Sequence, residues 1–332
     1  MEYKQIMDNL KKKIYHPVYF LWGDEPYYID KISDFIAGNV LTDAEKGFNQ
    51  AVYYGKDTEV QTISEASRRF PMMANQQVII VKEAQLLKNI EKLKHYVENP
   101  LDSTILVINY KYKKLDKRTS FAKALNKHSV VFESKKMYEN RIPGWIEEFL
   151  SESKYSITPQ AAVMLAEYLG AELSKVANEL KKLTIALPEN TRITPEHIEK
   201  NIGISKDYNI FELQNALGER NVLKANQIIN YFGTNPGNNP IQRTISSLYM
   251  FFAKLFMYHF LPDKSERSVA ASLGLHPFIA KSYIRAAKKY HPRRLYSIIG
   301  ILRDYDMKSK GYGNVSTSPA DLQKEMVYKI LH

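Results

Sequence analysis

Apolar residues follow two alternating spacings along the first 136 residues. Short apolar runs, some of them continuous, are typical of strands buried on both faces of a parallel sheet. The predicted strands are Val18–Trp22, Ala51–Tyr54, Val78–Val81, Thr104–Asn109 and Val130–Phe132. Apolar positions at helical spacing lie between these runs. The alternation predicts an α/β domain over residues 1–136, with a parallel sheet and helices on both of its faces.

Beyond this domain the pattern is helical, and we find no convincing strand. A hydroxyl residue precedes a proline at Thr158-Pro159, Thr194-Pro195 and Ser318-Pro319, an arrangement typical of helix starts. We predict a small helical domain over residues 139–205 and a larger one over 208–332. The predicted fold class is therefore α/β plus all-α.

The first strand ends at Gly23 and is followed by a predicted helix, as in the opening unit of a nucleotide-binding domain. A phosphate-binding loop there would read G-x-x-x-x-G-K-[ST], but residues 23–30 read GDEPYYID. Asp24 and Glu25 would repel a triphosphate, and Pro26 has no N–H to donate. We interpret Gly23, Asp24 and Glu25 as a degenerate nucleotide site that does not bind ATP.

Other signs of catalysis are missing from the sequence. The strand Val78–Val81 runs into Lys82, which places a positive charge where a magnesium-binding Asp would be expected. There is no G-x-S-x-G or H-E-x-x-H motif, and no two histidines are four residues apart. We predict no catalysis, no cofactor and no metal.

An apolar loop is predicted before the strand Val78–Val81. Residues 68–77 read RRFPMMANQQ, with Phe70, Pro71, Met72 and Met73 in succession. One interpretation is that these side chains pack back onto their own domain. The other is that they form an exposed wedge for a partner's pocket, a role that suits the adaptable methionine side chain.

Charge and cysteine usage narrow the class of protein further. The chain has no cysteine, which excludes disulfides and thiolate metal sites and fits a cytoplasmic protein. No apolar run is long enough to span a bilayer, and the N-terminus lacks a signal-peptide core. The net charge is +11, and Lys264–His332 alone carries 13 Lys and Arg against 5 Asp and Glu. Polyanionic partners, nucleic acid above all, are therefore favoured.

Five motifs in this order resemble a known family. They read PVYFLWGDEPYYID at 17–30, FPMMANQQVIIVKEA at 70–84, LDKRTSFAKAL at 115–125, GAELSKVANELKKL at 170–183 and NPIQRTISSLY at 239–249. Together they resemble the delta subunit of the bacterial DNA polymerase III clamp loader, over essentially the whole chain.

This resemblance implies an AAA+-like fold that has lost ATP binding, followed by a helical lid domain and a helical collar domain. It implies that the chain grips a sliding clamp and holds the ring open, beside ATP-binding and delta-prime-type subunits. Two adjacent apolar residues of the family enter a clamp pocket, and they map onto Met72 and Met73. The pair is often Leu-Phe elsewhere, so Met-Met departs from the pattern but stays apolar.

The resemblance also implies primed DNA as a ligand of the complex. Aromatic residues in a basic setting can stack on unpaired bases, and the candidates are Phe278, Lys308, Lys310 and Tyr312. These aromatic side chains could instead be core residues, and the charges an ordinary solvated face.

Two other functions remain open on the sequence alone. One is an AAA+ ATPase with an unusual phosphate loop, which measurable nucleotide binding would support. The other is a stand-alone DNA-binding protein, which predicts steeply salt-dependent affinity for DNA but leaves the apolar loop unexplained.

Overall fold

The computed structural model describes residues 1–332, and the chain forms two compact units, Met1–Met137 and Tyr138–His332. The sequence predicted a first domain ending at 136. The predicted division of the second unit into 139–205 and 208–332 stays a prediction.

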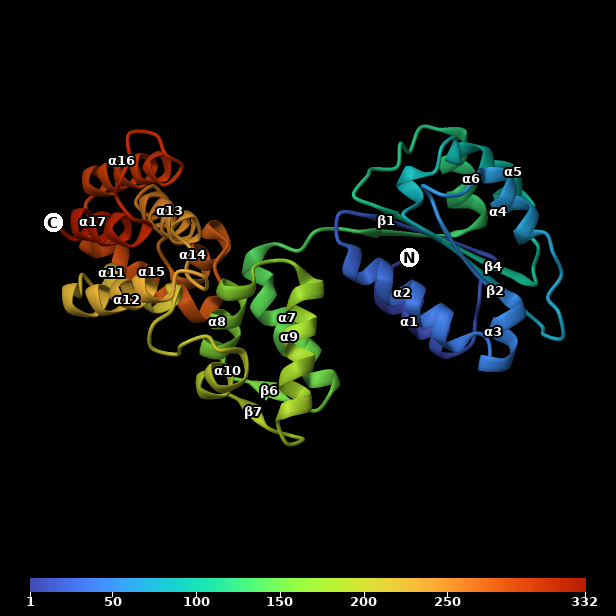
Figure 1. The fold of residues 1–332 in the computed structure, drawn as a ribbon, viewed down its shortest axis with the longest axis horizontal. Coiled ribbons are helices and arrows are strands. Elements are labelled where there is room, and N and C mark those ends of the chain that lie inside the picture. Colours follow the sequence, from blue (N-terminus) through green and yellow to red (C-terminus); the bar gives the residue numbers. More distant parts are fainter. The chain divides into compact units, whose positions relative to one another are not determined.

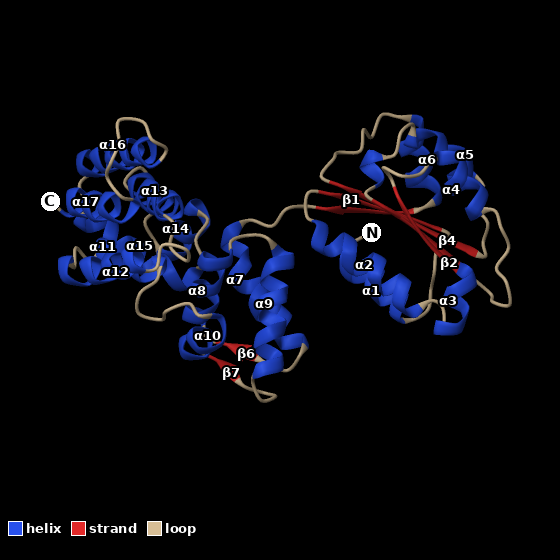
Figure 2. Ribbon diagram, in the orientation of Figure 1, coloured by secondary structure: helices blue, strands red, loops and turns tan.

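The first unit is a parallel sheet covered by helices (Figures 1 and 2). Its five strands are β1 (Val18–Gly23), β2 (Gln50–Tyr54), β3 (Gln77–Lys82), β4 (Thr104–Lys111) and β5 (Val130–Ser134). They lie in the order β2-β3-β4-β1-β5, and every neighbouring pair is parallel. The C-terminal ends of all five strands therefore lie at one edge of the sheet, and their N-terminal ends lie at the other.

Helices cover both faces of this sheet. The helices of the first unit are α1 (Tyr3–Lys11), α2 (Pro26–Asn39), α3 (Asp43–Asn49), α4 (Val60–Ser67), α5 (Lys94–Glu98) and α6 (Ser120–His128). Helices α1 and α2 bury apolar residues against one face, with Tyr19 and Leu21 of β1. Helices α4, α5 and α6 cover the other face, with Val18 and Phe20. Because both faces are covered, the strands read as apolar runs.

The second unit is almost entirely helical. Its helices are α7 (Ile142–Glu152), α8 (Pro159–Leu169), α9 (Leu173–Ala186), α10 (Pro195–Ile202), α11 (Ile210–Gly218), α12 (Val222–Thr234), α13 (Ile241–Tyr258), α14 (Glu266–Leu273), α15 (Pro277–Lys289), α16 (Pro292–Ser309) and α17 (Pro319–Leu331). The predicted fold class of α/β plus all-α is thus confirmed. No helix of the structure has the length and apolar character needed to cross a membrane.

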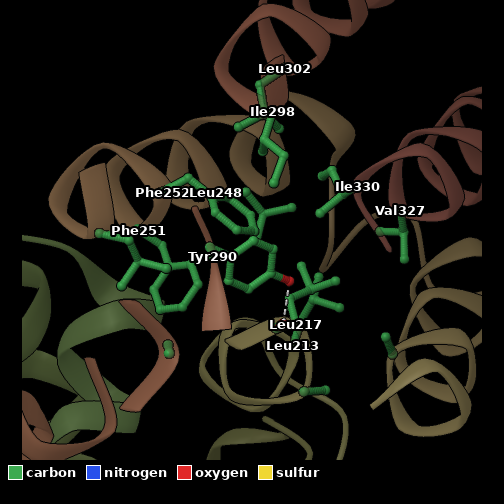
Figure 3. Close-up of a cluster of buried hydrophobic side chains, with 14 of the residues drawn as sticks. Leu213, Leu217, Leu248, Phe251, Phe252, Tyr290, Ile298, Leu302, Val327 and Ile330 are labelled. Atoms are coloured by element: carbon green, nitrogen blue, oxygen red, sulfur yellow. Dashed lines mark hydrogen bonds between the residues drawn. The ribbon is translucent and has the colours of Figure 1, made fainter. Parts of the chain in front are cut away.

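The seven helices from α11 to α17 share one large hydrophobic core (Figure 3). Helix α13 contributes a continuous buried face that includes Leu248, Phe251 and Phe252. Tyr290 is buried in this core, and its hydroxyl donates a hydrogen bond of 2.6 Å to the carbonyl of Leu217. The buried polar group is thereby satisfied, which fixes the end of α11 against the start of α16.

Two sequence predictions about elements were wrong. The second unit does contain strands, because β6 (Ser156–Ile157) pairs with β7 (Arg192–Ile193) in parallel. At two residues each, they are too short to give an apolar pattern. Between the predicted strands Val78–Val81 and Thr104–Asn109, the apolar positions at helical spacing predicted one helix over residues 86–97, but this segment is divided into 3₁₀ turns and the short α5. Asn89 adopts a left-handed backbone conformation there, which prevents a continuous helix.

Candidate functional site

The apolar loop of residues 68–76 connects α4 to β3, at the edge of the sheet where strands begin. Its three largest apolar side chains, those of Phe70, Met72 and Met73, do not pack into their own unit. Phe70 is 76% exposed, Met72 62% and Met73 101%, while Pro71 is half-buried. Exposed apolar side chains clustered in one segment are typical of a surface that binds a partner. The loop is therefore the first candidate site, and we call residues 70–73 the wedge.

The side chain of Asn49 holds the backbone of the wedge. Its Oδ1 accepts a hydrogen bond of 2.6 Å from the N–H of Met72, and its Nδ2 donates one of 2.9 Å to the carbonyl of the same residue. Nδ2 also lies 3.1 Å from the carbonyl oxygen of Glu45, one turn earlier in α3. Asn49 is 4% exposed, so these bonds form away from water. They tie α3 to the wedge, 23 residues further along the chain.

A second buried amide fixes the root of the loop. Gln77 begins β3, and its Nε2 contacts the hydroxyl oxygen of Thr104 at 2.6 Å and the carbonyl oxygen of Ala66 at 3.3 Å. The same nitrogen bonds the carbonyl of Arg69. Thr104 in turn donates to the carbonyl of Ser67. These bonds satisfy the carbonyls at the end of α4 that the helix itself leaves free. The loop therefore leaves the domain from a rigid base.

The wedge has an unusual backbone at its tip. Met73 has a φ of 54°, the left-handed region that a long side chain rarely adopts. Such a conformation costs of order 1–3 kcal/mol and persists only where the surroundings fix it. The hydrogen bonds to the preceding residue, Met72, supply that constraint. The result is a methionine side chain that points fully into solvent.

The residues that we predicted to form a degenerate nucleotide site lie at the opposite edge, where the strands end. Gly23 has a φ of 132°, and a Cβ there would lie 2.1 Å from the carbonyl oxygen of Ser134. The glycine is thus required by close packing of β1 on β5. The Ser134 hydroxyl donates to the carbonyl of Glu25 at 2.6 Å, and the Glu25 N–H donates to the carbonyl of Ser134 at 3.2 Å.

The N-terminus of α2 is capped from within. The Glu25 carboxylate, 3% exposed, accepts a hydrogen bond of 3.1 Å from the N–H of Tyr27. Pro26 is the first helical residue and offers no donor, and Asp24 is exposed beside it. A helix N-terminus binds phosphate through free N–H groups and its positive dipole end. Here a buried carboxylate already occupies that position.

The candidate DNA-contacting residues fall into two places. Lys308, Lys310 and Tyr312 share the end of α16 and the turn that follows, and Tyr312 is 73% exposed. Lys310 forms an ion pair of 2.7 Å with Asp306, and the Lys308 ammonium lies 4.9 Å from the ring centre of Tyr305. These lysines therefore also interact with their own helix.

Phe278 lies on another element, near the start of α15. It is 48% exposed and lines a cavity of about 510 Å³ together with Phe251 and Arg285. Neither Phe278 nor Tyr312 is a fully buried core residue. Arg285, on the same helix, lies 3.6 Å from the carboxylate of Glu219, so part of the basic charge of α15 is used within the fold.

Two partly buried charged residues, Glu167 and Lys254, line a second cavity of the helical unit, of about 230 Å³. Burial raises the pKa of Glu167 and lowers the pKa of Lys254, because both lose hydration. The opposite charges of Glu167 and Lys254 act against both shifts, because each charge stabilises the charged form of the other group. No group of three or more His, Cys, Asp or Glu in the structure could hold a metal ion.

Sequence reasoning missed the two residues that hold the loop, Asn49 and Gln77. Helix α3 was not predicted either, although Thr42 and Glu45 form a capping box at its start, a signal readable in the sequence. Asn49 itself leaves no such signal, because its partner is distant in sequence.

Comparisons with known proteins agree with this architecture. Residues 19–135 match the family model described as DNA polymerase III, delta subunit, and residues 207–316 match the model of the delta subunit's C-terminal domain. The DNA polymerase III subunit delta of Bacillus subtilis (strain 168) is 28% identical over 319 residues, covering 92% of this chain and 91% of the relative. The solved Bacillus subtilis DNA clamp loader delta protein superposes with a TM-score of 0.60 at 23% identity, covering 99% of each chain.

The matched family models and the curated relative first define a class, the subunits of DNA polymerase III. Within it, the chain belongs to the family of bacterial DNA polymerase III delta subunits. The resemblance carried by the sequence motifs is thereby confirmed.

Proposed function

We propose that this chain binds a sliding clamp through the wedge and opens the ring, or holds it open, for loading onto primed DNA. The observation that carries the proposal is the wedge itself, with Phe70, Met72 and Met73 exposed on a loop that the domain holds from beneath. The other clamp-loader subunits, ATP-binding and delta-prime-type, are its partners in this function.

The energetics of the wedge suit an interface anchor. Complete burial of a methionine side chain in a partner's pocket contributes about 1.5–3 kcal/mol. Met72 and Met73 together would therefore supply a large share of a binding free energy, as hot-spot residues do. Because the loop is held before binding, little of this free energy is lost in ordering it.

Ring opening follows from a difference in affinity. A wedge that binds the open ring more tightly than the closed ring shifts the population towards the open state, by at most that difference. In this proposal ATP is bound only by the partner subunits, because the Glu25 carboxylate occupies the position where this chain would bind phosphate. We therefore expect no ATP hydrolysis by this chain.

DNA contact is a second, separate part of the proposal. The exposed ring of Tyr312 lies among lysines at the end of α16, where stacking on an unpaired base and phosphate contacts can act together. Phe278 would form a separate contact. A stand-alone DNA-binding function is less well supported, because it gives the wedge no role.

The test is binding of the purified chain to its cognate clamp without nucleotide, compared with Met72→Ala/Met73→Ala. Loss of both side chains should weaken binding by about 100-fold or more. The matched control is Ile185→Ala/Leu223→Ala, which removes two exposed aliphatic side chains, 85% and 71% exposed, from the helical unit. This control should bind like wild type.

If the wild-type chain does not bind, the measurement is repeated with the partner subunits and ATP present. Failure there as well would refute the clamp-binding function. Nucleotide binding by the isolated chain would instead favour the ATPase alternative.

A further inference from the structure

Asn49 makes hydrogen bonds that reach beyond its own helix. Within α3, which Asn49 ends, its Nδ2 donates to the carbonyl of Glu45 one turn earlier. Asn49 then uses the same amide to pair with both the N–H and the carbonyl of Met72. This two-sided pairing resembles the pairing between neighbouring strands, and the amide side chain supplies both the acceptor and the donor that it needs.

The pairing fixes the backbone of the wedge without covering its side chains. Met72 remains 62% exposed although its peptide groups are held by a residue that is 4% exposed. Met73 follows directly, with its left-handed backbone and completely exposed side chain. Helix α3 and the loop lie side by side in Figure 1, as these hydrogen bonds require.

We propose that Asn49 is a positioning residue for clamp binding, which holds Met72 and Met73 in the conformation that enters the partner's pocket. This inference rests on the proposed function. A loop that is ordered beforehand does not lose conformational entropy on binding, so releasing it weakens binding without removing any contact residue. Asn49 itself touches only the chain to which it belongs.

The variants separate the hydrogen bonds from the packing. Asn49→Leu keeps the branched shape and the number of non-hydrogen atoms of the side chain and removes all three bonds. Asn49→Asp keeps an acceptor for the Met72 N–H but cannot donate to the carbonyls of Met72 and Glu45. The matched control is Asn39→Leu, because Asn39 caps α2 through a bond of 2.9 Å to the carbonyl of Phe35. The control removes a helix-capping Asn from the same unit and leaves the wedge unchanged.

Three measurements are made on the full chain: the Kd for the cognate clamp, hydrogen exchange at the Met72 amide, and the melting temperature. We expect Asn49→Leu to weaken clamp binding by at least about tenfold, as two lost hydrogen bonds would. Exchange at the Met72 amide should accelerate by a similar factor, while β3 amides keep their protection. Asn49→Asp should be intermediate, and Asn39→Leu should leave binding and Met72 exchange as in wild type.

A double-mutant cycle shows whether Asn49 acts through the wedge. In the Met72→Ala/Met73→Ala background, Asn49→Leu should cause little further loss of affinity. Full additivity would overturn the inference, as would wild-type affinity in Asn49→Leu while the methionine variant loses binding; the proposed function would survive both results. Should Asn49→Leu fail to fold, wild-type affinity and Met72 exchange in Asn49→Asp would overturn the inference. Absence of clamp binding by wild type, with partners present, would remove both proposals.

Discussion

The two loops at opposite edges of the parallel sheet differ in whether their side chains are packed or left in solvent. At the edge where strands end, Gly23, Glu25 and Ser134 pack against one another and satisfy their own hydrogen bonds. At the edge where strands begin, buried amides satisfy the backbone and leave Phe70, Met72 and Met73 in solvent. A strand of six residues separates the edges by about 20 Å.

The difference locates the two kinds of site in the domain. The strand-end edge, where a nucleotide would bind in an α/β domain of this type, is closed by the chain's own side chains. The strand-start edge carries the exposed wedge. We infer that the domain acts through its wedge and uses the old nucleotide edge only for stability, and the following predictions test that division.

The largest effect on stability is expected at Gly23. In Gly23→Ala the new Cβ would lie 2.1 Å from the Ser134 carbonyl oxygen, on a backbone with φ of 132°. We expect the free energy of unfolding to fall by at least about 3 kcal/mol, measured by urea denaturation. The control is Gly38→Ala in α2, where a Cβ meets nothing within 4 Å. The control should be neutral or stabilised by up to about 1 kcal/mol.

Gln77→Leu tests the base of the wedge. The substitution leaves the carbonyls of Ala66 and Arg69 without this donor, at a cost of about 1–3 kcal/mol in unfolding free energy. Because the loop loses its root, clamp affinity should fall in the same variant. Unchanged affinity, measured on the folded protein, would show that the base of the loop does not position the wedge.

Glu25→Ala tests the closed edge. Loss of the helix cap should cost about 0.5–2 kcal/mol of stability, measured by denaturation. Glu25→Gln keeps a carbonyl oxygen as acceptor and should lose less. Clamp binding should stay at the wild-type level in both variants. Neither variant should bind nucleotide, because Pro26 and the altered loop would still lack contacts to phosphate. Nucleotide binding by either variant would contradict this interpretation.

Phe70→Ser gives the smallest expected change in stability. The side chain is 76% exposed and packs little in the free chain, so the free energy of unfolding should stay within about 0.5 kcal/mol of wild type. Its clamp affinity should nevertheless fall. Strong destabilisation would indicate that Phe70 packs on its own domain, the interpretation that the structure disfavours.

The sequence predicts the fold well where elements are buried on two sides. All five strands of the sheet were predicted, and the three inner strands β1, β3 and β4, buried on both faces, leave unbroken apolar runs. Helix α3 was missed, since its seven residues DAEKGFN are mostly polar. The strands β6 and β7 were missed because two residues carry no period.

The site was predicted less completely. The apolar sequence of the wedge singles out its candidate contact residues, but does not show whether they are exposed. The residues that hold it could not be read from the sequence, because Asn49 reaches Met72 across 23 positions and Gln77 reaches Thr104 across 27. A bond between one side chain and a distant backbone group has no local spacing by which it could be recognised.

We propose that the wedge binds the open ring more tightly than the closed ring. The most direct test compares the Kd of this chain for the closed clamp and for a clamp subunit whose ring interface has been broken by substitution. We predict tighter binding to the separated subunit, and loss of binding to both forms in Met72→Ala/Met73→Ala. Equal affinity for the two forms would contradict ring opening by this chain.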